Sequence, residues 1–118
     1  LGYFSHWITP EGIPRRYDTR FFVAAAPAGQ PLRPDGREAV AADWLTPAAA
    51  LAAHACGDLR LIFPTIRNLE ALAAFDDVAA LLTHTQQPRP VPAMLPKMRN
   101  TPQGVRLLLP GDAGYAEA

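Results

Sequence analysis

The chain has 118 residues, enough for one small domain with a modest hydrophobic core. Its eleven basic and eleven acidic residues cancel, so the net charge gives no reason to expect nucleic acid or a membrane surface as a partner. The single cysteine, Cys56, excludes a disulfide within the chain and fits a reducing compartment such as the cytoplasm. No apolar run approaches the roughly 20 residues that span a bilayer.

The first predicted strand covers residues 19–26. Before it, Pro10, Gly12 and Pro14 mark a loop, because proline fixes φ and glycine frees it. From Phe21 onward the strand carries only aromatic, β-branched or small residues, so both of its faces are apolar. This pattern predicts a buried strand in the middle of a sheet that is covered on both sides.

A second strand and a helix are predicted next. Residues 27–36 form a turn-rich loop, and a strand follows over residues 38–45, although its alanines have low β-propensity. The helix covers residues 48–56 and has clear boundaries. Thr46 is a good N-cap, Pro47 suits the first helical position, and Gly57 stands where a C-cap glycine is expected.

Two more helices are predicted before a proline-rich tail. One runs from residue 66 to about residue 75 with Thr65 as its cap, and Asp76 and Asp77 favour the start of another. Prolines then recur at positions 88, 90, 92 and 96, which predicts an extended tail over residues 87–118 with one short strand at 105–109. Residues 1–86 are expected to form the domain itself.

Several short motifs, taken in order, resemble the Nudix hydrolases, specifically the branch that includes the peroxisomal and mitochondrial coenzyme A diphosphatases. The motifs are Trp-Ile-Thr-Pro at 7–10, Pro-Arg-Arg-Tyr-Asp-Thr-Arg-Phe-Phe at 14–22, Asp-Gly-Arg-Glu at 35–38, Asp-Trp-Leu-Thr-Pro at 43–47 and Phe-Pro-Thr at 63–65. They cover most of the chain at compatible spacing. The resemblance implies an α/β fold, the α/β/α sandwich with a mixed sheet of the Nudix type.

One departure from the family pattern is large. The family signature is Gly-x5-Glu-x7-Arg-Glu-U-x-Glu-Glu-x-Gly-U, with U aliphatic, and its glutamates hold the divalent metal ions. The nearest string here, residues 37–43, has alanines where the two metal-binding glutamates should stand. In the family the signature precedes the Trp-Ile-Thr-Pro motif, so we expect this chain to be the C-terminal portion of the domain. The ligands for Mg²⁺ or Mn²⁺ are then expected mostly upstream of Leu1.

Three arginines are the candidate substrate-binding residues. Arg15 and Arg16 follow a proline at the entry of the first predicted strand, and Arg20 lies within it. Guanidinium groups match the oxygens of a diphosphate, which the resemblance implies as the substrate's reacting group. The alternative is a solvated charged loop whose arginines pair with Asp18 or Glu11.

Glu38 is the candidate catalytic carboxylate. It follows the Asp-Gly turn at 35–36 and precedes Trp44, where many Nudix enzymes place an acidic residue that reaches the metal-bound diphosphate. The alternative is a solvated glutamate at the start of a strand.

Other residue types give weaker signals. The three histidines, His6, His54 and His84, lie far apart in the sequence, so their spacing does not predict a zinc site. Trp7 and Trp44 are expected first as packing anchors, on either of which a base or pantetheine group would be able to stack.

The resemblance implies metal-dependent hydrolysis of a diphosphate linked to a nucleoside, with coenzyme A or an acyl derivative as substrate. Two alternatives remain open. One is a diphosphatase for another nucleotide, such as an ADP-sugar. The other is a non-catalytic nucleotide-binding or interaction module that lacks the metal helix.

Overall fold

The computed structural model describes residues 1–116 except 28, 30, 32 and 38–42. The chain forms two compact units, one made of Leu1–Val23 with Thr85–Ala118 and the other of Ala24–His84. Helices and strands are both present, and the larger of the two sheets is mixed. The predicted α/β class is therefore confirmed.

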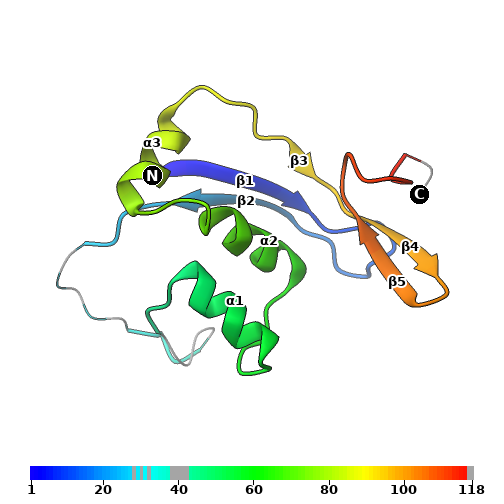
Figure 1. The fold of residues 1–118 in the computed structure, drawn as a ribbon, viewed down its shortest axis with the longest axis horizontal. Coiled ribbons are helices and arrows are strands. Elements are labelled where there is room, and N and C mark those ends of the chain that lie inside the picture. Colours follow the sequence, from blue (N-terminus) through cyan, green and yellow to red (C-terminus); the bar gives the residue numbers. More distant parts are fainter. Residues whose placement is uncertain (28, 30, 32, 38–42, 117–118) are drawn as a thin grey trace. The chain divides into compact units, whose positions relative to one another are not determined.

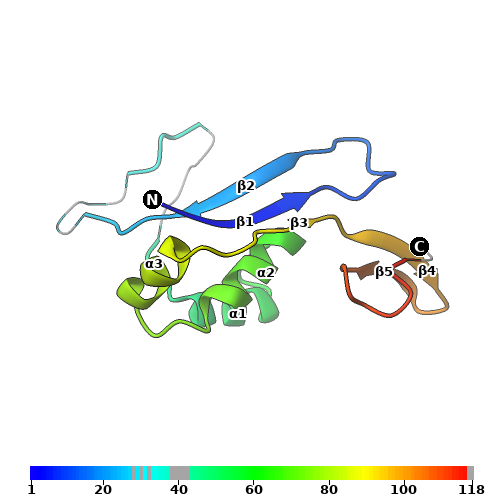
Figure 2. The same cartoon turned by 90° about the horizontal axis from the view of Figure 1, so that it is seen from above.

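The first unit is built on the strand β1, Gly2–Ile8. This strand pairs antiparallel with β2, Asp18–Val23, and parallel with β3, Ala93–Met94, which gives the sheet order β2-β1-β3 (Figures 1 and 2). A shift of register in β1 lies between Tyr3 and Ser5. The central strand of the sheet is thus the one nearest the start of the chain.

This arrangement corrects the prediction for β2. The strand ends at Val23, and within the described sheet it lies at the edge, because it pairs only with β1. Its side chains are mostly exposed, and Phe22 is 53% exposed. The prediction of a covered central strand over residues 19–26 is therefore wrong. Apolar residues on both faces show that a segment tolerates burial, but they do not determine its neighbours.

The sequence analysis assigned no strand before Trp7, yet β1 holds the core of this unit. Trp7 is only 6% exposed, which confirms it as a packing anchor. Gly2 is buried, and a Cβ atom at this position would lie 2.1 Å from Oγ1 of Thr85. Glycine is therefore required at the start of β1, where the end of a helix approaches its backbone.

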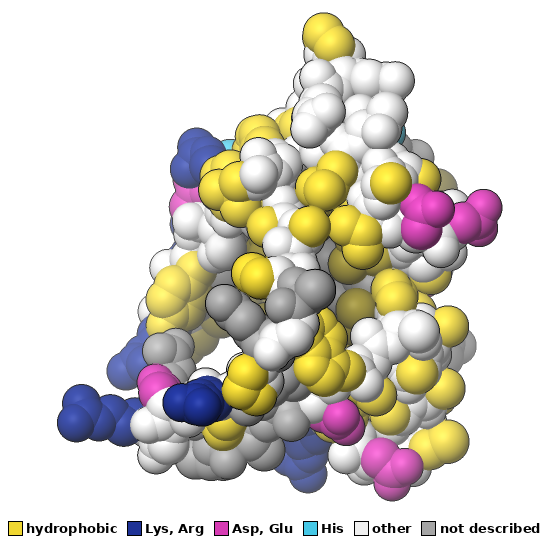
Figure 3. Space-filling model, turned by 90° about the vertical axis from the view of Figure 1, so that its left-hand side faces the viewer, with side chains coloured by type: hydrophobic (Ala, Val, Ile, Leu, Met, Phe, Trp, Pro, Cys, Tyr) yellow, Lys and Arg dark blue, Asp and Glu magenta, His cyan; other side chains and the backbone are white. Residues whose placement is uncertain are grey.

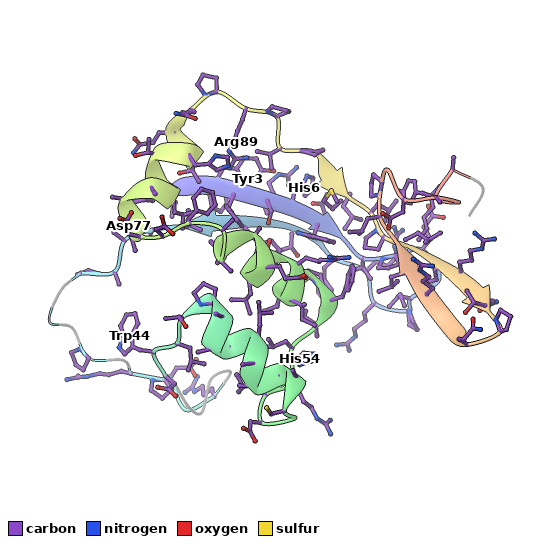
Figure 4. All side chains as sticks on the ribbon, viewed as in Figure 1. Tyr3, His6, Trp44, His54, Asp77 and Arg89 are labelled. Carbon is purple, nitrogen blue, oxygen red and sulfur yellow. The ribbon has the colours of Figure 1, made fainter. Side chains whose placement is uncertain are left out.

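Arg89 is hydrogen-bonded to β1 beside the residues that pair with β3. β3 lies opposite His6 and Trp7, whereas Nη2 of Arg89 donates hydrogen bonds to the carbonyl oxygens of Tyr3 and Phe4 (Figure 4). These carbonyl groups are thereby paired without a further strand, as partly buried backbone polar groups require.

The first unit also contains a β-hairpin made of β4, Lys97–Thr101, and β5, Gly104–Leu108. Gly104 has a φ of +114°, a conformation that suits glycine at the tight turn. The predicted strand at 105–109 is confirmed with a shift of one residue, but β3 and β4 were not predicted. The prolines at 92 and 96 lie just before these two strands rather than inside them, so they do not prevent pairing.

The second unit contains α1, Pro47–Ala55, and α2, Phe63–Leu72. The predicted boundaries of α1 are confirmed, because the amide of Ala49 donates to Oγ1 of Thr46 at 3.1 Å and Gly57 follows the helix with a φ of +84°. The helix α2 begins earlier than predicted. Ile62 is its N-cap without a side-chain bond, Phe63 is its first residue, and Pro64 and Thr65 lie in the first turn, where proline is tolerated.

The third helix, α3, covers Val78–Gln86. The amide of Ala80 donates to Oδ1 of Asp77 at 2.8 Å, which confirms that this acidic pair starts a helix. Of the strand predicted over 38–45, residues 38–42 lie outside the described residues, and residues 43–45 have no regular structure. Trp44 is 64% exposed, so its prediction as a packing anchor is wrong. The predicted domain division at residue 86 stays a prediction.

Many large apolar side chains of the described residues are exposed. They include Tyr17, Phe22, Trp44, Ile62, Val78 and Val105, and hydrophobic side chains cover much of the face drawn in Figure 3. The helices that the structure describes are all too short or too polar to cross a membrane.

Replacement of the α1 cap tests how far local signals stabilise this fold. We expect Thr46→Ala to lower the free energy of unfolding by about 1 kcal/mol, because the amide of Ala49 loses its acceptor. The matched control is Thr83→Ala on the exposed side of α3, where alanine favours the helix and no loss is expected. Urea titrations of both variants measure the difference, and equal stabilities would show that the cap contributes nothing.

Candidate functional site

The loop of residues 9–17 connects β1 to β2 and carries the predicted arginines. Three hydrogen bonds between Thr9 and Tyr17 close its base. The carbonyl oxygen of Tyr17 accepts from the amide and from Oγ1 of Thr9, at 2.9 and 3.3 Å, and the amide of Tyr17 donates to Oγ1 of Thr9 at 2.9 Å. Gly12, at the tip, has a φ of +89°, which an L-residue adopts only with strain. The loop therefore has a fixed base and a turn that its sequence encodes. We call it the arginine loop.

The two neighbouring arginines of the arginine loop have different surroundings. Arg16 donates from Nε and Nη2 to the carbonyl oxygen of Thr9, at 3.3 and 3.2 Å, so its guanidinium group stabilises the loop. Arg15 is exposed and makes no hydrogen bond or ion pair with any residue that the structure describes. Arg15 is therefore the arginine whose donors are open to a ligand.

Arg20 belongs to a small charged cluster on the β1–β2 pair. Its Nη1 lies 3.7 Å from Oδ1 of Asp18, and the same carboxylate oxygen contacts Nε2 of His6, which lies on β1 directly opposite Arg20 (Figure 4). The His6 side chain is only 12% exposed. Asp18 and Arg20 lie two residues apart on β2 and therefore on the same face of the sheet, so this geometry favours the alternative in which Arg20 pairs with Asp18.

A pocket that the sequence analysis missed borders the arginine loop. It has a volume of about 180 Å³ and is lined by Glu11 from the loop and by Leu95, Pro96, Lys97 and Met98 from the chain around the start of β4. Met98 is next to the loop itself, because its Cε lies 3.4 Å from where a Cβ atom on Gly12 would be. We call this the loop pocket.

Lys97 is held in place at the loop pocket by Tyr115. Its Nζ donates to the carbonyl oxygen of Tyr115 at 3.1 Å and lies 4.4 Å from the centre of the tyrosine ring, while the tyrosine hydroxyl donates to the carbonyl oxygen of Leu95 at 2.7 Å. Lys97 belongs to no sequence motif, so only its contacts in the folded chain identify it as a candidate site residue. The arginine loop therefore carries an exposed guanidinium group at Arg15 and, through Glu11, borders a small pocket.

The described residues do not fit the metal cage of the Nudix family. Among residues 1–116, apart from the gaps given above, no three His, Cys, Asp or Glu side chains gather closely enough to hold a metal ion. Glu38, the predicted catalytic carboxylate, lies outside the described residues.

Substitution of the adjacent arginines separates their structural roles. We expect Arg16→Ala to lower the free energy of unfolding by about 0.5–1.5 kcal/mol, since it removes the hydrogen bonds to Thr9. Arg15→Ala makes the same change of charge one residue earlier and is expected to leave the stability unchanged. Thermal unfolding of both variants is the measurement. An equal loss in both would mean that net charge, rather than the contact with Thr9, stabilises the loop.

Comparison with known proteins finds similarity to a human protein whose name gives its activity. The chain is 31% identical over 117 residues to the human protein named acyl-coenzyme A diphosphatase NUDT19, and the alignment covers 96% of this chain. The chain spans only 31% of the length of that relative. No family model and no solved structure matches the chain itself. The similarity supports a relationship to the Nudix hydrolases at this distance, and the relative is by its name a hydrolase of a diphosphate.

Proposed function

We propose that the chain serves a Nudix-type hydrolase that cleaves nucleoside-diphosphate-linked compounds, with coenzyme A or an acyl-coenzyme A as the substrate. The observation that carries this proposal is the 31% identity across 96% of the chain to an enzyme whose name gives that substrate. The motifs with which the sequence resembles the family include the arginine loop. The proposed compartment is the cytoplasm, and the proposed ligand is a small molecule rather than nucleic acid or a membrane.

In this proposal, Arg15 binds the diphosphate. A guanidinium group donates several hydrogen bonds in a fixed planar arrangement that suits phosphate oxygens. The hydrogen bonds from Arg16 and between Thr9 and Tyr17 hold the loop before the ligand arrives, which reduces the entropy lost on binding. Arg20 would contribute less, because Asp18 already lies beside it.

The proposed reaction depends on Mg²⁺ or Mn²⁺, which would supply an activated water and neutralise charge on the diphosphate. The described residues hold no suitable cluster of ligands. We therefore assign to this chain only substrate binding and positioning, together with a proposed catalytic role for Glu38.

The two alternatives are separated by one experiment. Binding and hydrolysis of coenzyme A, an acyl-coenzyme A and an ADP-sugar are measured with Mg²⁺ and Mn²⁺, on the 118-residue chain and on any longer polypeptide that its gene encodes. A preference for the ADP-sugar would make it the substrate in place of coenzyme A. Binding without hydrolysis by the 118-residue chain and by every longer polypeptide would indicate a non-catalytic module.

We expect the 118-residue chain to bind coenzyme A but not to hydrolyse it, and a longer polypeptide that carries the signature glutamates to do both. In that polypeptide, Arg15→Ala should lower kcat/KM by roughly ten- to a hundred-fold, through the loss of a charge-assisted hydrogen bond of about 1.5–3 kcal/mol. The matched control is Arg60→Ala, which removes the same charge from an exposed position of the second unit. Equal kinetics of the two variants would reduce Arg15 to a surface charge.

The role of Glu38 has its own test. If its carboxylate assists the reaction, Glu38→Gln should lower kcat by about a hundred- to ten-thousand-fold, as the loss of a general base or of a group that orients the metal would. The circular dichroism spectrum should remain unchanged. Retention of both the activity and its dependence on Mg²⁺ in this variant would show that Glu38 has no part in the reaction.

A further inference from the structure

We propose that the loop pocket binds a neutral aliphatic chain that carries an amide group, which in the proposed substrate is the pantetheine arm of coenzyme A. The inference rests on the proposed function and deepens it, because it assigns one part of the substrate to one set of residues.

The walls of the loop pocket suit an aliphatic chain. Leu95 and Met98 present carbon and sulfur atoms, Pro96 is a fully buried part of the wall, and the methionine is flexible enough to adapt to a ligand. An apolar cavity of about 150 Å³ is able to hold a benzene molecule. A pocket of about 180 Å³ therefore has room for a short branched alkyl segment.

The two charged residues of the pocket match the two polar groups of an amide. Glu11 is exposed and makes no hydrogen bond or ion pair with any described residue, so its carboxylate is able to accept a hydrogen bond from an amide N–H. Lys97 gives one of its three donors to the carbonyl oxygen of Tyr115, which leaves donors for an amide oxygen. One residue with an acceptor and one with donors thus line the same pocket, which suits the two polar groups of an amide.

The same pair of charges disfavours a phosphate in the pocket. A phosphate that approaches Lys97 is repelled by the carboxylate of Glu11, whereas a neutral amide meets no such repulsion. Phosphate binding belongs instead at Arg15, four positions further along the same loop. Coenzyme A joins its diphosphate directly to an amide-bearing chain, so one molecule offers a group to each of the two places.

The two methionines of the chain provide the readout. Met98 lines the loop pocket, whereas Met94 lies on β3 opposite Trp7 and is absent from the pocket lining. We expect pantetheine, which has no phosphate, to shift the NMR signal of a ¹³C-labelled methyl group at Met98 and to leave that of Met94 in place. ADP, which has no pantetheine arm, should instead shift the backbone amide of Arg15.

Two exposed residues of the arginine loop give matched variants. Glu11→Ala should weaken pantetheine binding about tenfold and leave the affinity for ADP within about twofold, because it removes one charge-assisted hydrogen bond. Arg15→Ala should have the opposite pattern. Both residues are exposed and make no hydrogen bond or ion pair with a described residue, so both variants should keep the fold, which the unchanged signal of Met94 checks.

The possible outcomes distinguish a failure of the inference about the pocket from a failure of the proposed function. If ADP binds but pantetheine leaves the Met98 signal in place, the loop pocket does not hold the arm, while the proposed function stands. If pantetheine binds and ADP does not, the pocket is supported and the diphosphate site at Arg15 is not. If inorganic phosphate moves the Met98 signal and pantetheine does not, the pocket is an anion site and the inference is overturned.

Discussion

The closure of the arginine loop by Thr9 and Tyr17 is the interaction on which the candidate site depends. These residues exchange hydrogen bonds where β1 ends and β2 begins, and Arg16 adds a bond to the carbonyl oxygen of Thr9. Because the base is fixed, the positions of Glu11 and Arg15 relative to the sheet follow from the pairing of the two strands. A binding surface made of exposed loop residues is thereby positioned without a buried polar network.

Neighbouring side chains of the arginine loop and of β2 have different roles as a result of this geometry. Arg16 and Arg20 have partners within the chain, whereas Arg15 and Glu11 make no hydrogen bond or ion pair with a described residue. Identical side chains close in sequence thus have different roles, one structural and one available for a ligand. The similarity to an acyl-coenzyme A diphosphatase is consistent with a ligand that has both a charged and a neutral part.

The sequence predicted the features that depend on neighbouring residues. The boundaries of α1 follow from Thr46, Pro47 and Gly57, and the start of α3 follows from Asp77, because caps act within one helical turn. The place of β2 in the sheet was predicted wrongly, since it depends on β1 and β3, and the latter lies some seventy residues away. The role of Lys97 was not predictable either. It arises from the ring of Tyr115 and from the arginine loop, which lie near it only in the folded chain.

The contact of Gly2 with Thr85 has a consequence for synthesis on the ribosome. β1 and β2 are able to pair as soon as both have emerged, but Thr85, Arg89 and β3 follow only after residues 24–84. At about 5–20 residues per second, this interval lasts about 3–12 s. Throughout that time one edge of β1 presents unpaired backbone groups, which are able to join a strand of another nascent chain. The order of the elements along the chain therefore delays the pairing of β1 with β3 until residues 93–94 have been made.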